Sequence, residues 1–206
     1  MDSKLYELIK IYNPNTFLDI GANNGEYASE ILKEFPSIKV LSIEANIACE
    51  PHLKDKNLNY IIACPSDKKE VKTFYKTKLY ETNTGNSLYK ENTHLYTDDH
   101  LITESIQTDT LDNILSDFKD ITFDFMKLDT QGSELDILKG SNNILNGVKI
   151  IICETDIAKY NENCPKQQEI IEYLTSKNFK CLGSIYNHYW NGVMVQQDLV
   201  FEKVMV

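Results

Sequence analysis

Residues Phe17 to Tyr27 read FLDIGANNGEY, and this stretch decides the fold. A short apolar run, Thr16 to Ile20, leads into a turn that contains Gly21 and Gly25, and a helical pattern follows at once. The glycines remove Cβ atoms that would keep a ligand away from the backbone. The helix presents unpaired N–H groups at its start. The pattern is typical of a strand-to-helix turn that holds a nucleotide-like ligand, although an ordinary tight turn is the alternative.

The spacing of the glycines indicates which ligand. A dinucleotide site requires G-x-G-x-x-G, whereas here Gly21, Asn23 and Gly25 have no third glycine at the required offset. Asp19 lies two residues before the first glycine, where a carboxylate suits a cationic group better than a phosphate. The turn therefore favours S-adenosylmethionine, which has no phosphate.

A second acid follows at the end of the next predicted strand. Lys39 to Ile43 (KVLSI) ends at Glu44, which lies 44 − 19 = 25 positions after Asp19. In nucleoside-binding sheets an acid about 20 residues after the glycine turn accepts hydrogen bonds from the ribose hydroxyls. A solvated glutamate at a strand end is the alternative, and the glycine turn favours the ribose interpretation.

Length and composition indicate one folded domain over residues 1–206. The net charge of −10 makes nucleic acid a poor partner. Five scattered cysteines without a CxxC pair favour a reducing compartment over a disulfide framework or a zinc site. The sequence shows neither a secretory signal nor an apolar run of membrane-spanning length, so we expect a cytoplasmic protein with no membrane partner.

Strand and helix patterns alternate along most of the chain. They predict an N-terminal helix within residues 1–14, further helices near 25–35, 48–54, 110–117, 133–140 and 165–177, and strands at 16–20, 39–44, 60–64, 102–107, 122–128 and 149–154. Residues 71–75 look like an added edge strand. The last strands, 179–182 and 193–202, are joined by residues 183–192, too few for a helical crossover, so this pair should be antiparallel. The pattern predicts an α/β fold with a largely parallel sheet.

Residues 79–101 have no periodicity and contain Tyr80, Tyr89 and Tyr96. An irregular stretch this long in a compact domain is usually a lid, a binding loop or disorder. Because disordered segments are poor in aromatic residues, we expect a loop that closes over a ligand. A plain surface loop is the alternative.

A third motif, Asp129-Thr130-Gln131-Gly132-Ser133-Glu134, follows the strand 122–128. Asp129 ends a central strand, where open α/β sheets place their ligands. Glu134 falls in the first turn of a helix, where negative charge is favourable, so it has a sufficient structural role in starting that helix. Asp129 has a structural alternative as a turn former.

With these motifs the chain resembles the FkbM family of S-adenosylmethionine-dependent methyltransferases. The similar segments are FLDIGANNGEY, KLDTQGSELDILKG at residues 127–140 and IQTDTLDNIL at residues 106–115, with looser matches at ACPSD, ICET and QQDLVFEK. The resemblance covers about residues 15–155 and implies a Rossmann-like class I methyltransferase fold, with a seven-stranded sheet, an antiparallel last strand and helices on both faces. At Glu44-Ala45-Asn46 the chain lacks the proline that the family commonly has after the acid.

The resemblance also implies roles for individual residues. The methionine and ribose side of the cofactor would contact Asp19, Gly21, Ala22, Asn23 and Gly25. Glu44 would hold the ribose hydroxyls with Ala45 beside it, Ser66 and Asp67 would lie near the adenine, and Asp129 would lie beside both cofactor and acceptor. Family members mostly methylate hydroxyl groups, often on sugars or other small metabolites, so a small-molecule or glycan acceptor is implied.

Transfer to a hydroxyl group needs a general base, because a sugar hydroxyl is hardly ionised at neutral pH. Asp129 and Glu154 both end central strands, and either could take the proton, with Asp129 slightly favoured. His188, in an aromatic segment, ranks last. His94, Asp98, Asp99 and His100 match no metal-binding spacing, so no metal site is predicted.

Two other classes of function remain open. A nicotinamide-dependent oxidoreductase would also use a glycine turn and a ribose acid, although the missing third glycine disfavours it. A non-catalytic S-adenosylmethionine-binding module would keep the pocket without the chemistry. The sequence indicates neither the identity of the acceptor nor the oligomeric state.

Overall fold

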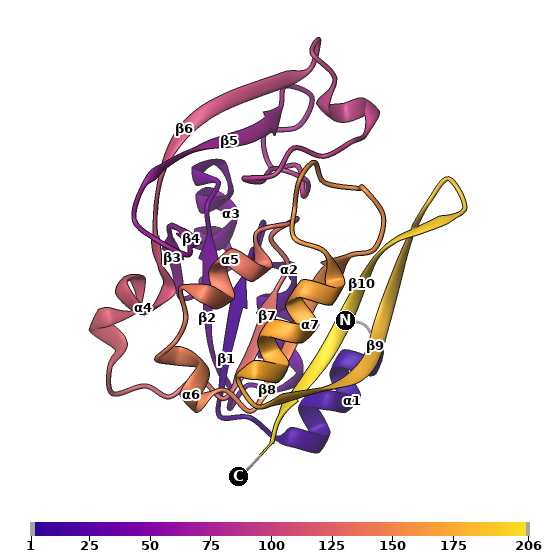
Figure 1. Cartoon of the computed structure of the whole chain (residues 1–206). Coiled ribbons are helices and arrows are strands. Elements are labelled where there is room, and N and C mark those ends of the chain that lie inside the picture. Colours follow the sequence, from indigo (N-terminus) through magenta and orange to yellow (C-terminus); the bar gives the residue numbers. More distant parts are fainter. Residues whose placement is uncertain (1–2, 205–206) are drawn as a thin grey trace.

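Seven strands form the central sheet of the computed structural model, which describes residues 3–204 (Figure 1). Their order is β3-β2-β1-β7-β8-β10-β9, with neighbours parallel from β3 to β8 and antiparallel from β8 to β9. The bounds are β1 Thr16–Ile20, β2 Lys39–Glu44, β3 Tyr60–Ile62, β7 Phe125–Leu128, β8 Ile150–Asp156, β9 Phe179–Trp190 and β10 Val193–Lys203. The predicted α/β class, the seven-stranded Rossmann-like sheet and its antiparallel last pair are confirmed.

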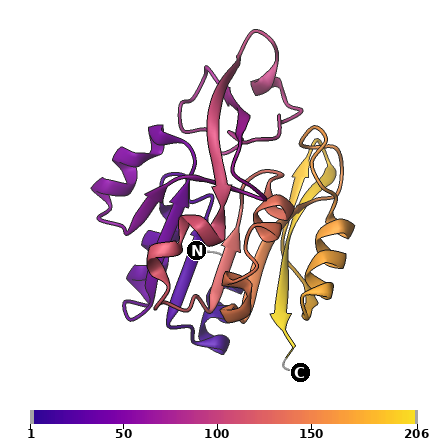
Figure 2. The ribbon, with the colours of Figure 1, turned by 60° about the vertical axis from the view of Figure 1, so that its left-hand side comes forward.

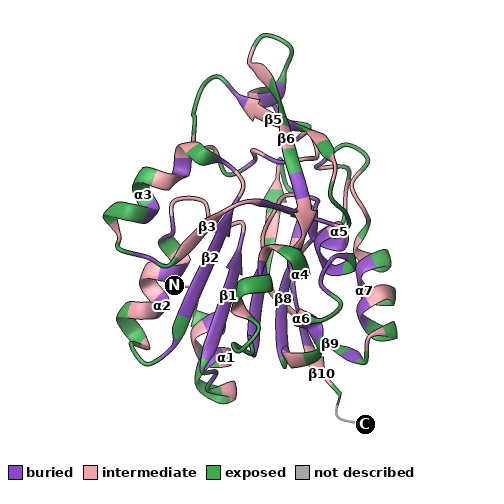
Figure 3. Ribbon diagram, turned by 90° about the vertical axis from the view of Figure 1, so that its left-hand side faces the viewer, coloured by how far each residue is buried: buried purple, intermediate pink, exposed green. Residues whose placement is uncertain are grey.

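Helices cover both faces of this sheet, because successive strand residues alternate between two apolar cores. Leu18 and Ile20 of β1 join the core under one set of helices, whereas Phe17 joins the other. The first set comprises α4 Leu111–Ile114, α5 Glu134–Lys139, α6 Ile144–Gly147 and α7 Gln167–Ser176, and the second comprises α1 Ser3–Tyr12, α2 Glu26–Glu34 and α3 Glu50–Asp55. Figure 3 shows the central strands buried between partly exposed helices. None of these described helices is long and apolar enough to cross a lipid bilayer.

A smaller sheet of three strands lies above the ends of the central strands in both ribbon views (Figures 1 and 2). Its order is β4 Cys64–Ser66, β6 Leu101–Thr110, β5 Val71–Thr77. The prediction of one strand over 60–64 is wrong, because the chain leaves the central sheet after Ile62 and pairs with β6 instead. The prediction that residues 71–75 add an edge to the main sheet is also wrong, because β5 pairs with β6 along its whole length.

The last two strands form a longer hairpin than predicted. Residues 183–190 continue β9, so the connection is only Asn191-Gly192 rather than residues 183–192. Both turn residues have positive φ values, 48° and 76°, as a two-residue turn that matches strand twist requires. Figure 1 shows this hairpin extending beyond its neighbouring strands.

The segment 79–100 contains one short 3-10 turn, η2 His94–Tyr96, and two isolated bridges, from Ser87 to Tyr75 and from Glu91 to Asn161. It follows β5 and returns to β6, so it stands over the carboxyl ends of the central strands (Figure 2). The other 3-10 turns are η1 Ile47–Cys49 and η3 Ser116–Phe118. The loop therefore has the position that a lid requires.

Candidate active site

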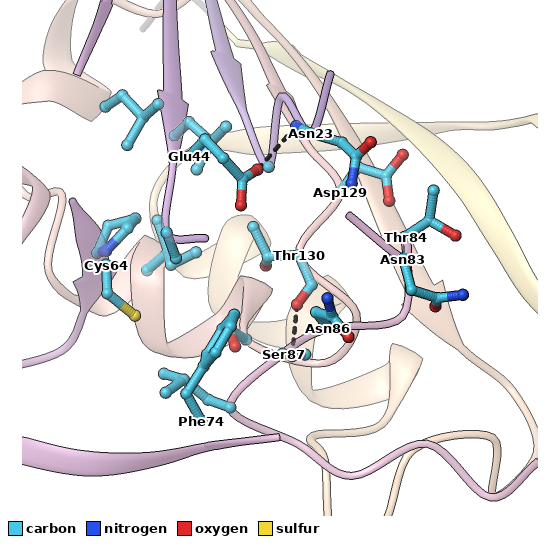
Figure 4. Close-up of a pocket in the computed structure, with 18 residues that line it drawn as sticks. Asn23, Glu44, Cys64, Phe74, Asn83, Thr84, Asn86, Ser87, Asp129 and Thr130 are labelled. Carbon is cyan, nitrogen blue, oxygen red and sulfur yellow. Dashed lines mark hydrogen bonds between the residues drawn. The ribbon is translucent and has the colours of Figure 1, made fainter. Parts of the chain in front are cut away.

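A cavity with about 510 Å³ of empty volume opens where β1, β2 and β7 end (Figure 4). This space includes a part that is open to solvent, and about 50 Å³ of it can hold the centre of a water-sized sphere. Of the predicted cofactor residues, five line the cavity: Gly21, Asn23, Glu44, Ala45 and Asp129. The others, Asp19, Ala22, Gly25, Ser66 and Asp67, do not line it.

The glycine turn forms one wall of this cavity and is held on two sides. The N–H groups of Gly21 and Ala22 donate to the carbonyl of Ile43 on β2, at 2.9 and 3.1 Å. On the other side, the Asp129 N–H donates to the Ile20 carbonyl at 3.0 Å. The turn thus fixes the spacing between the ends of three parallel strands.

The carboxylate of Glu44 is held in place by two backbone donors. The N–H groups of Asn23 and Asn46 donate to Oε2 and Oε1, each at 2.7 Å. The side chain is only 8% exposed, and burial raises its pKa despite these two donors. Because each carboxylate oxygen accepts two hydrogen bonds, Glu44 can still accept two hydroxyl donors from the cavity that it lines.

Asp19 lies on β1, just before the glycine turn, and is buried. Burial raises its pKa to about 6, although Lys127 acts in the opposite direction. Its Oδ2 atom is buried without a hydrogen-bond partner. A buried acceptor that lacks a donor is costly, so this atom fits a ligand that brings a cationic donor such as an amino group.

The loop 79–100 closes the cavity from above, and its Asn83, Asn86 and Ser87 line it. The side-chain amide of Asn23 donates to the Thr82 carbonyl at 3.1 Å, and that of Asn46 donates to the Glu81 carbonyl at 2.6 Å. The two residues that support the Glu44 carboxylate therefore also hold the loop.

A second anchor joins the same loop to the motif after β7. The Ser87 hydroxyl lies 2.8 Å from the carbonyl oxygens of both Thr130 and Gln131 and donates to this pair (Figure 4). Tyr89 donates from its hydroxyl to Asp136 at 2.9 Å. These contacts favour the interpretation of residues 79–101 as a lid rather than as a plain surface loop.

Ser66 and Asp67 belong to a separate polar group beneath the small sheet. The Lys72 ammonium donates to the Ser66 hydroxyl at 2.8 Å and lies 3.4 Å from both Asp67 and Asp136. Cys64, Pro65 and Phe74 line the cavity on this side instead. An adenine role for Ser66 and Asp67 therefore stays a prediction without a direct contact in the lining.

The two candidate bases, Asp129 and Glu154, lie close together, and Asp129 lines the cavity whereas Glu154 does not. Gln131 donates from Nε2 to Glu154 Oε2 at 2.6 Å and to Asp129 Oδ1 at 3.2 Å. Gln196 of β10 also donates to Glu154, at 3.2 Å. The Lys127 ammonium lies 2.6 Å from Asp129 Oδ2. The structure thus brings both carboxylates into one hydrogen-bonded group.

The pKa values of these carboxyl groups shift in opposite directions. Burial acts to raise the pKa of Asp129, but the ion pair with Lys127 and further hydrogen bonds outweigh it and hold the pKa below its usual value. Burial raises the pKa of Glu154 well above its usual value, and the nearby charge of Asp129 adds to this shift. One carboxyl group therefore stays ionised under conditions in which the other can hold a proton.

Glu134 stabilises the turn between β7 and α5. Its Oε1 accepts from the Thr130 N–H at 2.7 Å, and its Oε2 accepts from the Gly132 N–H at 3.0 Å. The side chain is 3% exposed. It therefore does more than start a helix, because it fixes the backbone that presents Gln131 to the two carboxylates.

Glu134 should make the protein more stable at mildly acidic than at mildly alkaline pH. Burial raises its pKa from an ordinary value of 4.5 to about 7. The folded protein then binds this proton more tightly than the unfolded chain, so the stability is fully present below about pH 4.5 and is lost as the pH rises through 7. We expect a loss of about 2 kcal/mol in the free energy of unfolding between pH 5 and pH 8. Urea unfolding of the wild type and Glu134→Gln should show a smaller loss in the variant, and equal losses would contradict this assignment.

His188 lies on β9, within an aromatic group beyond the two carboxylates. The ring of Tyr160 contacts the rings of His188 and Trp190, at 5.7 and 6.5 Å between centroids. His94 of the lid stacks on Trp190 at 6.0 Å. A buried glutamate, Glu91, hydrogen-bonds to Tyr160. His188 is absent from the lining of the cavity.

Several residues in this region could not be singled out from sequence patterns. Gln131 stands within the third motif but is neutral, Gln196 is neutral as well, and Lys127 lies within an apolar strand pattern. Lys127 and Gln131 lie at or next to the carboxyl end of β7, whereas Gln196 lies near the amino end of antiparallel β10. Across residues 3–204 no group of three His, Cys, Asp or Glu side chains is arranged to hold a metal ion.

Comparisons with known proteins agree with this geometry. The sequence profile of the Methyltransferase FkbM domain matches residues 19–181. No curated protein matches the chain. Among solved structures, an uncharacterized protein from Listeria monocytogenes serotype 4b is 12% identical over 99% of this chain and 68% of its own, with a TM-score of 0.56.

Two further solved structures have methyltransferase folds. M. capricolum TrmK, in complex with S-adenosyl-homocysteine, is 12% identical over 98% of this chain and 69% of its own, with a TM-score of 0.51. An S-adenosylmethionine-dependent methyltransferase from Clostridium acetobutylicum is 10% identical over 97% of this chain and 89% of its own, with a TM-score of 0.52. At these identities the likeness concerns the fold.

Proposed function

Because the chain belongs to the FkbM family of S-adenosylmethionine-dependent methyltransferases, we propose that it transfers the methyl group of that cofactor to a hydroxyl oxygen. The acceptor is a sugar, a glycan or another small hydroxylated metabolite. The predicted cofactor, S-adenosylmethionine, is the one this family uses.

One observation supports the proposal above all others. The Glu44 carboxylate, held by two backbone N–H groups, faces a cavity that also has Asp129 in its lining. In this arrangement Glu44 binds the ribose hydroxyls, and the backbone of Gly21 and Asn23 supports the rest of the cofactor. The unpartnered Oδ2 of buried Asp19 accepts from the amino group of the methionine part.

When bound, S-adenosylmethionine supplies a methyl group on a positively charged sulfur, which leaves as a neutral thioether. The chain orients the acceptor and the cofactor for an in-line approach, which can account for much of the rate. Asp129 or Glu154 takes the proton that the acceptor hydroxyl loses. The lid excludes water from the cavity, and its closure is consistent with the hydrogen bonds from Ser87, Asn23 and Asn46.

The acceptor approaches from the side of the aromatic group. Tyr160 lies near two acids of this region. Its hydroxyl bonds to Glu91, and burial together with the charges of Glu91 and Glu154 raises its pKa. Trp190 and His188 extend the same wall along β9. Aromatic faces with nearby carboxylates suit a ligand that combines C–H surfaces with hydroxyl groups.

Two measurements on the purified chain test the function. Calorimetry should show binding of S-adenosylmethionine and of S-adenosylhomocysteine, and a mass-spectrometric screen of hydroxylated metabolites and glycans should find a product heavier by one methylene group. Binding of NADH without binding of S-adenosylmethionine would overturn the proposal. Cofactor binding with no methylated product from any hydroxylated acceptor would favour a non-catalytic binding module.

A further inference from the structure

Lys127 is a buried cation in contact with several acidic side chains. Its side chain is 3% exposed, and its ammonium lies 2.6 Å from Asp129 Oδ2. Asp19 and Asp198 are its next acidic neighbours, and the ring of Tyr27 lies 4.3 Å below the ammonium. A buried ammonium is costly unless it is paired, so this group needs its partners.

Strand register explains why these groups meet. Asp19 of β1 lies opposite Lys127 of β7, and Glu154 of β8 lies opposite Asp198 of β10. Alternation places all four side chains on the face of the sheet that α1 and α2 cover. Asp129 lies two residues beyond Lys127 on the same face, at the rim of the cavity.

The two carboxylates differ in their partners. Asp129 has the ammonium of Lys127 at contact distance, together with the amide of Gln131. Glu154 has the neutral amides of Gln131 and Gln196, and it hydrogen-bonds to Asp129. One cation at contact distance favours ionisation of one member of the pair far more than the other.

We propose that Lys127 is a positioning residue that keeps Asp129 ionised at the cavity, so that Asp129, and not its hydrogen-bonded neighbour Glu154, receives the acceptor proton. In the transfer step, an oxygen lone pair of the hydroxyl forms the new bond to the methyl carbon, and the electrons of the sulfur–methyl bond stay on sulfur. The O–H proton passes to the ionised Asp129 carboxylate, which lines the cavity. This assignment rests on the proposed function, and it decides between the two candidate bases in favour of Asp129.

The charged groups around Glu154 also favour an ionised Asp129 beside a protonated Glu154. The titratable groups that act on it are Asp129 and Lys127 of β7, Glu134 of α5, Asp198 of β10 and Tyr160 of the segment after β8. Burial and the three acidic neighbours raise the pKa of Glu154, whereas Lys127 opposes them. The pKa of Asp129 stays below its usual value. Glu154 therefore holds a proton while Asp129 is ionised, so Asp129 is the member of the pair that can accept one.

Titration of the ligand-free protein tests the inference without a known acceptor. Carboxyl-carbon NMR, with signals assigned through Asp129→Asn and Glu154→Gln, should show Glu154 titrating at higher pH than Asp129. In Lys127→Met the midpoint of Asp129 should rise by more than one pH unit, because the contact charge is gone. Lys127→Arg should restore the wild-type order.

Lys149→Met is the matched control, because Lys149 is an exposed lysine 3.6 Å from Asp124 at the other end of the strands. It should leave the Asp129 midpoint unchanged. If Lys127→Met does not fold, the order of the Asp129 and Glu154 midpoints in the wild type and in Lys127→Arg tests the inference instead. A midpoint of Asp129 above that of Glu154, or one that does not move in folded Lys127→Met, would overturn the role of Lys127.

Calorimetry on the same samples separates this inference from the proposed function. A reversed titration order in a protein that binds S-adenosylmethionine would overturn the role of Lys127 alone. Failure of the wild type to bind S-adenosylmethionine would overturn the proposed function, and with it the role of Asp129 as proton acceptor.

Discussion

Gly21→Ala should lower the free energy of unfolding by about 3 kcal/mol or more. Gly21 has a φ of +83°, and a Cβ atom there would lie 1.9 Å from the carbonyl oxygen of Asp129 and 2.7 Å from its carbonyl carbon. Both are backbone atoms of the residue that directly follows β7, so no flexible side chain can move aside. The N–H groups of the turn also donate to β2, so the turn cannot move away from Asp129 without breaking them.

Gly192→Ala separates backbone conformation from this steric clash. Gly192 has a φ of +76°, close to that of Gly21, but a Cβ atom there would have no neighbour within 4 Å. Its substitution should cost about 1 kcal/mol, the cost of the left-handed conformation alone. Urea unfolding of the two variants measures the difference, and equal losses of stability would contradict the steric explanation.

The central part of the fold could be predicted because local signals and long-range pairing agree there. The run Thr16–Ile20, the glycine turn and the helix after it are as expected, and Glu44 ends the next strand as the acid spacing indicates. These elements alternate along the chain and pair with neighbours in simple order. The positions of Asp19, Glu44 and Asp129 at adjacent strand ends follow from that order.

The antiparallel pairing of the last hairpin is predicted correctly, but its length is not, although a local signal for it exists. Asn191-Gly192 is a strong indicator of a two-residue turn, and it points to strands that run to it on both sides. The exposed aromatic residues before it, Tyr186 and Tyr189, suggest a loop only if the turn signal is ignored. A prediction that began from the turn would have placed His188 on a strand.

The second sheet and Lys127 could not be predicted from local patterns. Residues 60–66 contain two short strands, and only the pairing of Cys64–Ser66 with residues 108–110 shows where the first one ends. Lys127 lies in an apolar run, and its charge is compensated by acids from three different strands. Such a group exists only once the sheet is assembled.

Glu44→Ala should weaken the binding of S-adenosylmethionine at least tenfold and nearer to a hundredfold, or about 2.7 kcal/mol. In our proposal the carboxylate loses two hydrogen bonds from the ribose hydroxyls, each about 1.5 kcal/mol or more for a charged acceptor. The variant also removes the acceptor for the Asn23 and Asn46 N–H groups, which support the turn and the lid. Calorimetry with folded protein, checked by circular dichroism, measures the dissociation constant.

Two further variants distinguish the ribose contact from a general loss of structure. Glu44→Gln keeps the size of the side chain and one acceptor oxygen, so its loss of affinity should lie between those of the wild type and Glu44→Ala. Glu50→Ala removes a carboxylate from neighbouring α3 that bonds to Tyr60 and Lys54 and does not line the cavity. It should bind the cofactor as the wild type does. An unchanged dissociation constant in Glu44→Ala would overturn the ribose assignment, because no other acid in the cavity lining lies at the end of β2.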